Sequence, residues 1–459
     1  MIELEELEED KVDFKLNPLA SEAVKPTPRK INRISTISFR LIKLLFFFND
    51  SMILIYIIMI KLALYIFLFK FSFIHSGNYL LVVSFDGFRY DYLDKVETPT
   101  FDKLIDRGSF SNDVKTVFPS LTFPSHYSIA TGSYPDKHKI LGNKFYNKDI
   151  EKYYNYRDKE SVQNGDFYGS EPIWVTAERQ GVLSATFFWI GSEAMINGYR
   201  PSTYKKYDPS YSFRSRVDSV SNWFKKPFKD RPRLVMLYFN EPDYTGHKYG
   251  PDSKETNQSI KESDEILNYL VKSLNNLPIK DSINIIVLSD HGMATSGPEK
   301  LILLNDYIDT SPFQFWMKGS VLSIDNKNHN KTINQKTINQ LIKIPNLSVY
   351  TSETLPQSYN FYNSSFPGAL LVAGEGYYIS PDSRTYDAKG MHGYDPDLKS
   401  MKTIFIASGP NIKQNYKLDG FESIHIYPLF CKLLQIQPNT NIDGGSDGRL
   451  EVLEKILKN

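Results

Sequence analysis

The 459-residue sequence predicts an α/β domain with a central, mostly parallel sheet flanked by helices. Two observations support this fold class. Short apolar runs rich in β-branched and aromatic residues recur after residue 78, and helix-like segments separate them. Such alternation is typical of strands joined by helical crossovers, which run in parallel. No internal repeat and no Gly/Ser-rich linker interrupts the region, so we expect one domain over residues 78–443.

The expected elements follow one another along this domain. The expected strands are Tyr79–Phe85, Ser184–Trp189, Leu234–Phe239, Ile283–Ser289, Ala369–Ala373 and Thr403–Ala407. The expected helices are Thr98–Arg107, Ser125–Thr131, Glu171–Gln180 and Lys254–Leu274. The Asn- and Lys-rich residues 325–340 indicate a solvated loop. We expect residues 444–459 to form a C-terminal tail.

The first 75 residues differ in composition from the rest. Residues 1–50 combine an acidic start with a basic stretch, which predicts a disordered tail. Residues 51–75 hold an apolar run long enough to span a bilayer, although Lys61 and Lys70 interrupt it. Because Lys and Arg precede the run, the positive-inside rule places the N-terminus in the cytoplasm. We therefore expect a single-pass type II membrane protein with an extracellular or lumenal domain.

Two other interpretations of the apolar run remain open. Translation from Met59 would make residues 59–77 resemble a cleaved signal peptide, and the domain would then be secreted. The run could also be a buried helix. Export agrees with four Asn-x-Ser/Thr sequons that can carry surface glycans, at Asn257, Asn330, Asn346 and Asn363.

Composition excludes some classes of function. The formal net charge of +1 gives no indication of a nucleic-acid-binding face. Cys431 is the only cysteine, which excludes an intramolecular disulfide and a cysteine-based metal site. Its apolar neighbours predict a small buried side chain rather than a reactive thiol.

Five short blocks hold residues suited to a two-metal site, at residues 82–87, 121–126, 241–247, 289–293 and 390–394. They contain three Asp and three His ligand candidates and one Thr, namely Asp86, Asp243, Asp290, His247, His291, His392 and Thr122. Mixed carboxylate and imidazole is a ligand set that Zn²⁺ accepts. Two such ions can hold both oxygens of an in-line displacement at phosphorus.

The three Asp candidates each follow a predicted strand. In open α/β sheets the active crevice lies beyond the carboxyl ends of the strands, so Asp86, Asp243 and Asp290 should meet there. A single Asp after a strand is commonly a helix N-cap or a turn residue, but three favour a ligand cluster. Asp243 and His247, four residues apart, would share a helix face. Asp290 and His291 would either converge through a turn or face different metals.

Thr122 precedes the predicted helix that starts at Ser125. A hydroxyl there would lie near backbone N–H groups and the positive end of the helix dipole, where phosphate is stabilised. The alternative role of Thr122 is a helix N-cap. A threonine hydroxyl becomes a nucleophile at neutral pH only where its alkoxide is stabilised, for which a zinc site is suited.

In this order and spacing the blocks resemble the nucleotide pyrophosphatase/phosphodiesterase family of the alkaline phosphatase superfamily. The resemblance runs from about residue 78 to residue 443 and includes residues 130–135, 171–177 and 185–189. It implies an alkaline-phosphatase-like domain with two zinc ions. The implied activity is hydrolysis of phosphodiester or pyrophosphate bonds of nucleotides, for example ATP to AMP and pyrophosphate, through a phospho-threonine.

Carried over position by position, the resemblance divides the ligands between two sites. One zinc would take Asp86, Asp290, His291 and Thr122, and the other Asp243, His247 and His392. Asn143 would donate to a phosphate oxygen. The aromatic residues that match a nucleobase-binding pocket are Phe123, Tyr207 and Tyr238. Packing in the core is an equal alternative for Phe123 and Tyr207.

Other functions share part of this pattern. A sulfatase would need Cys or Ser in a Cys/Ser-x-Pro-x-Arg context, which neither Cys431 nor Thr122 provides. A choline-phospholipid phosphodiesterase of the same family, or a phosphomonoesterase, would use the same metal ligands. A non-catalytic cell-surface binding protein would be expected to lack one of them. We expect a monomer that acts on a nucleotide or related phosphodiester and has no nucleic-acid partner.

Overall fold

The computed structural model describes residues 55, 57–62, 78–328, 332–383, 387–440 and 445–458. The chain divides into two units, Met1–His75 and Ser76–Asn459, and the fold below is that of the second. The predicted tail 1–50 and most of the predicted span 51–75 lie outside the described residues. Within the described residues, no helix combines the length and the apolar character that crossing a bilayer requires.

The second unit is built on a nine-stranded sheet with the order β18-β2-β17-β8-β1-β7-β5-β6, and β19 also pairs with β2. The strands are β1 Tyr79–Phe85, β2 Gly108–Lys115, β5 Ser184–Phe187, β6 Thr203–Lys205, β7 Leu234–Phe239, β8 Ile283–Leu288, β17 Thr403–Ser408, β18 Tyr416–Lys417 and β19 Phe421–Glu422. The strands around β1 are parallel, whereas β17 runs antiparallel to β2 and β8. The prediction of a mostly parallel sheet is confirmed, with β17 as the exception.

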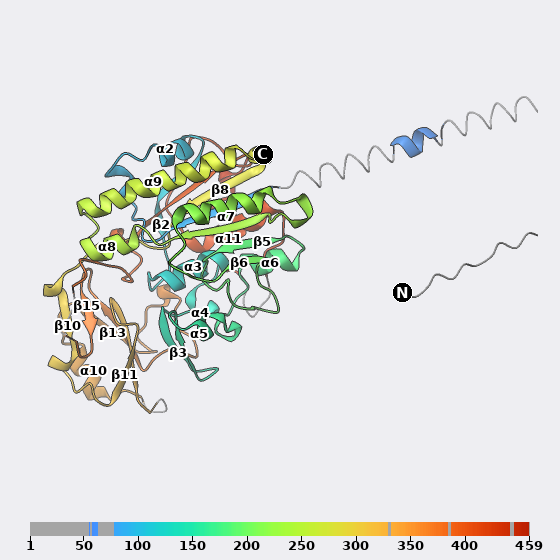
Figure 1. The fold of residues 1–459 in the computed structure, drawn as a ribbon. Helices are drawn as coiled ribbons and strands as arrows, with labels where there is room; N and C mark the ends of the chain where they lie inside the picture. Colours follow the sequence, from blue (N-terminus) through green and yellow to red (C-terminus); the bar gives the residue numbers. More distant parts are fainter. Residues whose placement is uncertain are drawn as a thin grey trace, which may run out of the picture. The chain divides into compact units, whose positions relative to one another are not determined.

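Helices cover both faces of this sheet (Figure 1). The side chains of the central strand β1 alternate between the two faces. On one face Leu81 and Val83 pack in a core with residues of α2 Pro99–Asp106, α7 Phe213–Lys225 and α9 Lys254–Asn275. On the other face Leu80 and Val82 pack in a second core with residues of α3 Thr122–Thr131, α6 Ile173–Arg179 and α11 Ile426–Leu434. A strand covered on both faces needs an unbroken apolar run, which β1 has.

A smaller antiparallel sheet, in the order β11-β12-β14-β13, forms its own core. Its elements are β11 Phe313–Trp316, β12 Val321–Asn326, β13 Leu347–Tyr350, β14 Ala369–Ala373 and the helix α10 Gln335–Leu341. The strand predicted at Ala369–Ala373 therefore exists but belongs to this second sheet. The loop predicted at residues 325–340 is wrong in part, because Ile338 and Leu341 of α10 are buried against the sheet.

Short elements complete the second unit. They are β3 Lys144–Asn147, β4 Lys152–Asn155, β9 Ala294–Thr295, β10 Leu301–Leu303, β15 Tyr378–Ser380, β16 Gly390–Met391, α4 Pro135–His138, α5 Lys159–Gln163 and α8 Asp243–Tyr249. Residues 445–458, expected as a tail, pack on the domain: Leu453 and Ile456 are fully buried. The domain therefore extends past the boundary predicted at residue 443. Cys431 is buried, as expected.

Candidate active site

Three loops at the ends of neighbouring strands bring carboxylates to one edge of the main sheet. Asp86 directly follows β1, Asp290 follows β8, and Asp243 opens α8 after β7. The loops are tied together, since Gly87 N donates to Asp290 Oδ1 at 3.1 Å and Asp243 N donates to Asp86 O at 3.0 Å. The structure therefore brings together the three carboxylates that strand-end placement predicted to meet.

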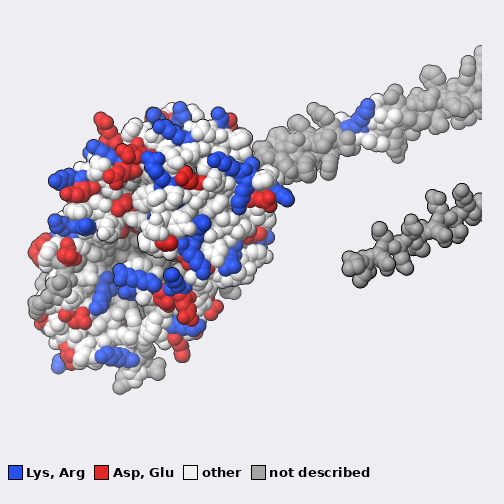
Figure 2. Space-filling view, in the orientation of Figure 1, with Lys and Arg blue, Asp and Glu red and all other residues white. Residues whose placement is uncertain are grey.

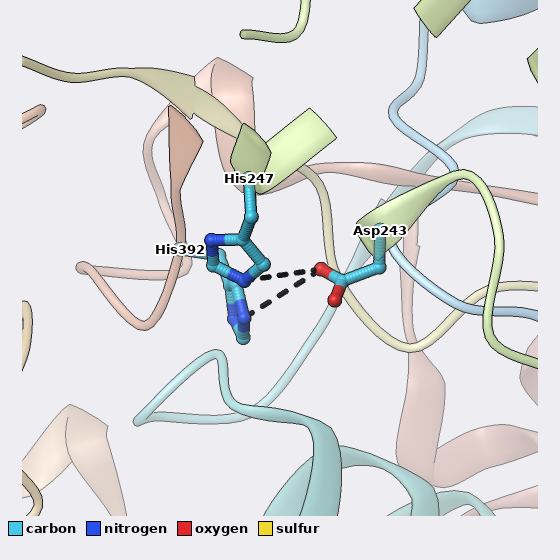
Figure 3. Close-up of side chains that lie close together, drawn as sticks. All are labelled: Asp243, His247 and His392. Carbon is cyan, nitrogen blue, oxygen red and sulfur yellow. Dashed lines mark ion pairs between the residues drawn. The ribbon is translucent and has the colours of Figure 1, made fainter. Parts of the chain in front are cut away.

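The first group of candidate ligands is Asp243, His247 and His392 (Figure 3). The Nε2 atoms of His247 and His392 lie 3.5 and 3.7 Å from Asp243 Oδ1. The other ring nitrogens face backbone carbonyls, with His247 Nδ1 2.8 Å from Gly390 O and His392 Nδ1 2.8 Å from Ser120 O. Because a carbonyl only accepts, Nδ1 of each ring donates to it, which leaves Nε2 as the nitrogen that faces Asp243.

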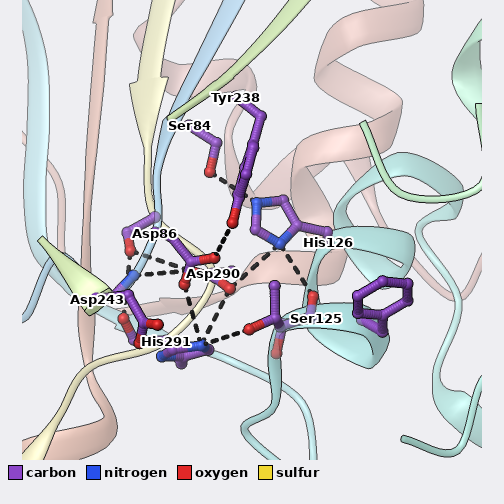
Figure 4. A network of polar contacts seen from close by, with 12 residues as sticks. Ser84, Asp86, Ser125, His126, Tyr238, Asp243, Asp290 and His291 are labelled. Carbon is purple, nitrogen blue, oxygen red and sulfur yellow. Dashed lines mark hydrogen bonds and ion pairs between the residues drawn. The ribbon is translucent and has the colours of Figure 1, made fainter. Parts of the chain in front are cut away.

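The second group surrounds His291 (Figure 4). Its Nε2 lies 3.3 Å from Asp86 Oδ1, 3.1 Å from Asp290 Oδ2 and 3.1 Å from Thr122 Oγ1. His291 Nδ1 faces the Gly292 carbonyl at 2.9 Å, which leaves Nε2 as the ring nitrogen that faces the two carboxylates and Thr122. Asp290 and His291 thus converge on one point, as the turn interpretation required.

The two groups adjoin. The His291 and His392 rings stack with centroids 3.5 Å apart and planes 11° from parallel. An oxygen of Asp243 also lies within 4.8 Å of ligand atoms of both Asp86 and His291. Two cations held by these groups would therefore be neighbours, which is the arrangement that a two-metal displacement at phosphorus needs.

The donor atoms fit cations of the size and chemistry of zinc. Three buried carboxylate oxygens receive no hydrogen bond in the described part of the chain, namely Asp86 Oδ1, Asp243 Oδ1 and Asp290 Oδ2. A buried carboxylate oxygen without a partner costs free energy, which a bound cation would offset. Ligand atoms of a tetrahedral zinc would be about 3.3–3.4 Å apart for bonds of about 2.05 Å. The observed nitrogen–oxygen separations, from 3.1 to 3.7 Å, lie around that value.

Electrostatics in the site also favour bound cations. Burial raises the pKa of Asp86 above its ordinary value, and the charges of Asp290 and Asp243 raise it further. Burial also acts to raise the pKa of Asp290, but the charges of His291 and His126 outweigh it and lower the pKa. Burial, with His291 and His247 nearby, lowers the pKa of His392, so its ring is neutral. Carboxylates crowded in this way stay charged together only beside positive charge.

Thr122 is the first residue of α3, and its hydroxyl points to the ligand groups rather than along the helix. The N-cap residue is Leu121, and no side-chain hydrogen bond caps this helix. The alternative role of Thr122 as an N-cap is therefore not observed. Instead, the Thr122 hydroxyl stands beside His291 at the edge of an open cavity.

His126 is a residue of this site that sequence analysis missed. It is fully buried, and its Nε2 lies 2.8 Å from Ser84 Oγ. Its Nδ1 lies 2.9 Å from Thr122 O and 3.2 Å from Asp290 Oδ2 (Figure 4). His126 therefore joins the first turn of α3 to a candidate ligand. The available signal was its spacing of four residues from Thr122, which places both on one helix face.

A cavity of about 500 Å³ opens beside the two groups, and we call it the active-site cavity. All four predicted substrate-binding residues line it, namely Phe123, Asn143, Tyr207 and Tyr238. Candidate ligands Asp86, Asp243, His247 and His392 line it as well, together with Thr122. The fully buried Asp290 and His291 are not among the lining residues.

The predicted substrate-binding residues differ in their hydrogen bonds and in their exposure. Tyr238 Oη donates to Asp86 Oδ2 at 2.5 Å, so Tyr238 orients a candidate ligand as well as lining the cavity. Asn143 Oδ1 accepts a hydrogen bond from Phe123 N at 3.3 Å. Tyr207 is 51% exposed, so the alternative that it packs in the core is not observed.

Comparison with known proteins places this site in a family. A family model described as type I phosphodiesterase/nucleotide pyrophosphatase matches residues 80–395, more than half of the chain. The chain belongs to this family. The predicted membership of the nucleotide pyrophosphatase/phosphodiesterases, within the alkaline phosphatase superfamily, is therefore confirmed.

Several relatives are similar over most of the chain. Venom phosphodiesterase CdcPDE of Crotalus durissus collilineatus is 35% identical over 391 residues, which is 83% of this chain and 46% of that protein. Human ectonucleotide pyrophosphatase/phosphodiesterase family member 1 is 35% identical over 82% of this chain and 42% of its own length. Bis(5'-adenosyl)-triphosphatase enpp4 of Xenopus laevis is 34% identical, over 78% of this chain and 79% of its own. The chain spans about half the length of the first two.

A solved structure is similar in the same way. Murine ectonucleotide pyrophosphatase/phosphodiesterase 5, as an inactive threonine-to-alanine variant in complex with AMP, superposes with a TM-score of 0.78. It is 32% identical, and the match covers 83% of this chain and all of that one. The similarity therefore extends to the fold of the family.

Proposed function

We propose that this chain is a two-zinc hydrolase that cleaves phosphodiester or pyrophosphate bonds of nucleotides, for example ATP to AMP and pyrophosphate. The observation that carries the proposal is the position of Thr122. Its hydroxyl lies 3.1 Å from His291 Nε2, where two carboxylate–imidazole groups adjoin, and it lines the active-site cavity. Membership of the family supports the activity.

Seven residues would hold the two ions. Asp86, Asp290, His291 and Thr122 would hold one, and Asp243, His247 and His392 the other. When bound, the ions would supply Lewis-acid stabilisation of the charge that develops on the oxygens around phosphorus. The backbone carbonyls behind the three imidazoles keep each Nε2 aimed at its group, so little reorganisation accompanies binding.

Thr122 would be the nucleophile. Its deprotonated Oγ1 forms a bond to phosphorus while the bond to the leaving oxygen breaks, which leaves a nucleotidyl group on Thr122. Water then hydrolyses this phospho-threonine, releases the nucleoside monophosphate and restores the hydroxyl. Asn143 would donate from its amide to a non-bridging phosphate oxygen, because its Oδ1 already accepts from Phe123 N.

The nucleoside would occupy the aromatic part of the active-site cavity. Phe123 is adjacent to Thr122, and Tyr207 lines the same cavity, so the two rings can hold a base between them. The AMP complex of the murine relative supports a nucleotide as the ligand of this part of the fold. Tyr238 would mainly hold Asp86 in place through its hydroxyl.

We further propose that the domain works outside the cytoplasm as a monomer, either anchored through residues 51–75 or secreted. The apolar composition of residues 51–75 supports the first alternative. On the side shown in Figure 2, positive and negative side chains are interspersed rather than gathered in a basic expanse. That distribution favours a small substrate over a nucleic-acid partner.

The test is the variant Thr122→Ala on the full chain, with a 4-nitrophenyl nucleotide ester as substrate. We expect activity to fall on the order of a thousandfold or more while about two zinc ions per chain remain bound. Thr131→Ala, at the other end of α3, is the matched control and should stay active. Full activity in Thr122→Ala would refute the assignment of the nucleophile.

Substrate class is tested with the same enzyme. A nitrophenyl phosphocholine, compared with the nucleotide ester, separates a nucleotide enzyme from a choline-phospholipid enzyme. Faster turnover of the phosphocholine ester would replace the proposed substrate. Absence of turnover of either ester by zinc-loaded protein would favour a non-catalytic binding protein.

A further inference from the structure

The wall of the active-site cavity carries a cation that the proposed reaction does not use. Arg157 follows the β3–β4 hairpin and lines the cavity. Among the described residues that line it, Arg157 is the one Lys or Arg side chain.

A chain of contacts connects Arg157 to the nucleophile. Phe123 directly follows Thr122, and the Phe123 ring lies edge-on to Tyr156, with centroids 5.7 Å apart. The Arg157 guanidinium lies 5.3 Å from the Tyr156 ring centroid, and Arg157 Nε donates to Tyr156 Oη at 2.9 Å. The guanidinium is therefore held one ring beyond Phe123, which the proposed function places against the base.

Only the Nε donor of this guanidinium has an acceptor in the described part of the chain, so the donors on its two η nitrogens are left for a ligand. Within the described part of the chain, neither η nitrogen of Arg157 donates to an acceptor or pairs with a carboxylate. Glu193, the other charged residue of the wall besides the candidate ligands, is already engaged. Its Oε1 accepts from Tyr207 N at 2.8 Å and its Oε2 from Gln163 Nε2 at 3.4 Å. Arg157 thus offers donors, and only donors, to a ligand.

The position of Arg157 indicates that it contacts the base of the substrate rather than the leaving group. In an in-line displacement the leaving group departs opposite Thr122, toward the group formed by Asp243, His247 and His392. Arg157 is reached from Thr122 by the other route, through Phe123 and Tyr156. If the sugar and phosphate of a nucleotide lie at the ligand groups, the edge of the base farthest from its glycosidic bond faces the cavity wall at Arg157. That edge carries the substituent at C6 of a purine or C4 of a pyrimidine.

We propose that Arg157 determines base specificity by donating to a keto oxygen at this far edge. The inference rests on the proposed function, since it assumes a nucleotide in the cavity. Guanine, uracil and thymine present a keto oxygen there, whereas adenine and cytosine present an amino group that donates and would face the Arg157 donors unpaired. The enzyme therefore prefers keto bases to amino bases.

The size of the preference follows from the setting of Arg157. A hydrogen bond from a charged donor to a buried acceptor discriminates by one to two orders of magnitude, and solvent exposure reduces this. Arg157 is exposed, and its partner ring Tyr156 is 37% exposed. We therefore expect a preference of about tenfold in kcat/KM for keto over amino bases.

The test uses 4-nitrophenyl 5'-monophosphate esters of guanosine, uridine, adenosine and cytidine, which share one leaving group. The wild-type chain should hydrolyse the guanosine and uridine esters about tenfold more efficiently than the other two. Arg157→Met should remove the difference between the two classes of base. Arg157→Lys, which keeps the charge but not the planar fork, should retain part of it.

The matched control is Arg200→Met. Arg200 is exposed and lies over the Tyr204 ring at 5.1 Å, the same pairing as Arg157 on Tyr156, but it does not line the cavity. This variant should keep the wild-type order of bases. A change in base order in Arg200→Met equal to that in Arg157→Met would contradict the proposal.

Three outcomes would overturn the inference while leaving the proposed function intact. One is a wild-type enzyme that hydrolyses all four esters equally well. Another is an Arg157→Met variant that slows all four by the same factor. The third is a loss in Arg157→Met for GTP but not for the guanosine nitrophenyl ester, which would assign Arg157 to the leaving polyphosphate. Failure of the proposed function is distinct, because the wild-type enzyme would then hydrolyse none of the four esters or would hydrolyse a nitrophenyl phosphocholine faster than all of them.

Discussion

The active-site cavity has two sides that are held in place by different contacts. We call the side with the candidate Asp and His ligands the metal side, and the side with Phe123, Tyr156, Arg157 and Tyr207 the aromatic side. On the metal side, the ring Nδ1 of each of His247, His291 and His392 lies 2.8–2.9 Å from a backbone carbonyl. On the other side, the side chains of Tyr156 and Arg157 are held by ring contacts and by the hydrogen bond between them. A hydrogen bond to a main-chain carbonyl does not depend on the identity of a second side chain, so the ligand rings are held by the backbone fold. Contacts between two side chains can be changed by substitution without altering the backbone of the sheet.

This difference suggests a division of work. The metal side carries out the chemical step. A small displacement of a ligand there would raise the free energy of the transition state and lower the rate. The aromatic side selects the substrate and contributes binding. Variants of the Asp and His ligands should therefore lower kcat and metal content together, and variants on the aromatic side should change KM or base preference with metal content unchanged.

The largest expected effect comes from removing a ligand. His392→Ala should lower kcat/KM on the order of a thousandfold and reduce zinc from about two ions to about one per chain. The physical reason is that Asp243 and His247 alone leave that ion weakly held. Zinc content by elemental analysis and turnover of a nitrophenyl nucleotide ester are the two measurements.

The control for this variant is another buried histidine, His138. Its ring lies on α4, hydrogen-bonded to Ser128 Oγ and Ile140 N, and it belongs to neither ligand group. His138→Asn should retain zinc and activity at neutral pH. Wild-type activity in His392→Ala would contradict the assignment of His392 as a metal ligand.

The next effect concerns His126, which joins Asp290 to the first turn of α3. His126→Leu should weaken zinc binding by about tenfold to a hundredfold, because outer residues that orient ligands contribute on that scale. His126→Asn, whose amide can still donate to Thr122 O, should recover part of the loss. Competition with a chromogenic chelator gives the zinc affinity without using activity; equal affinities in all three proteins would show that His126 serves packing alone.

A smaller effect is expected on the aromatic side. Tyr207→Ala should raise KM for nucleotide esters by about tenfold, the scale of one stacked base, and leave kcat and zinc content nearly unchanged. Tyr207→Phe keeps the ring and should behave like wild type, because base stacking does not need the hydroxyl. A fall in zinc content or kcat in Tyr207→Ala would show that the two sides are not independent.

The smallest effect on catalysis, but a clear one on stability, is expected for His138. Burial lowers the pKa of His138 from 6.5 to about 3. The unfolded chain therefore takes up a proton near pH 6.5 that the folded chain takes up only near pH 3, so stability is full above about pH 6.5 and declines as the pH falls toward 3. Between pH 7 and 5 this group should remove about 2 kcal/mol from the unfolding free energy.

His138→Asn provides the comparison for this pH dependence. Asparagine does not titrate, and its side-chain oxygen can accept the hydrogen bond from Ile140 N that His138 Nδ1 accepts. Urea denaturation of both proteins at pH 7 and pH 5 measures the difference in slope. An identical loss of stability in both would assign the acid sensitivity to other groups.

The metal side was largely predictable from sequence, for a physical reason. Parallel strands end at a common edge, so Asp86, Asp243 and Asp290 had to meet once the strands were placed. Helical spacing then placed His247 beside Asp243. The division of the ligands between two ions came from the family resemblance rather than from spacing. His126 was missed because its spacing from Thr122 indicates a shared helix face but not what the ring contacts.

The aromatic side was less predictable, because it is assembled by loops. Phe123 could be placed because it is adjacent to Thr122, but Arg157 follows a hairpin whose direction the sequence does not specify. The same limit applies to the fold. The apolar run Ala369–Ala373 gave the strand β14 correctly, but local composition carries no information about which sheet a strand joins. Local composition also did not indicate that Leu453 and Ile456 are buried against the core.

The most direct test of the central claim, that Thr122 attacks phosphorus, is the stereochemical course of hydrolysis. A nitrophenyl nucleotide phosphorothioate of one configuration would be hydrolysed in ¹⁸O-labelled water, and the configuration of the product determined. Each in-line displacement inverts phosphorus, so attack by Thr122 followed by attack of water predicts overall retention. Overall inversion would mean that water attacks phosphorus directly, and it would contradict the role of Thr122 as nucleophile.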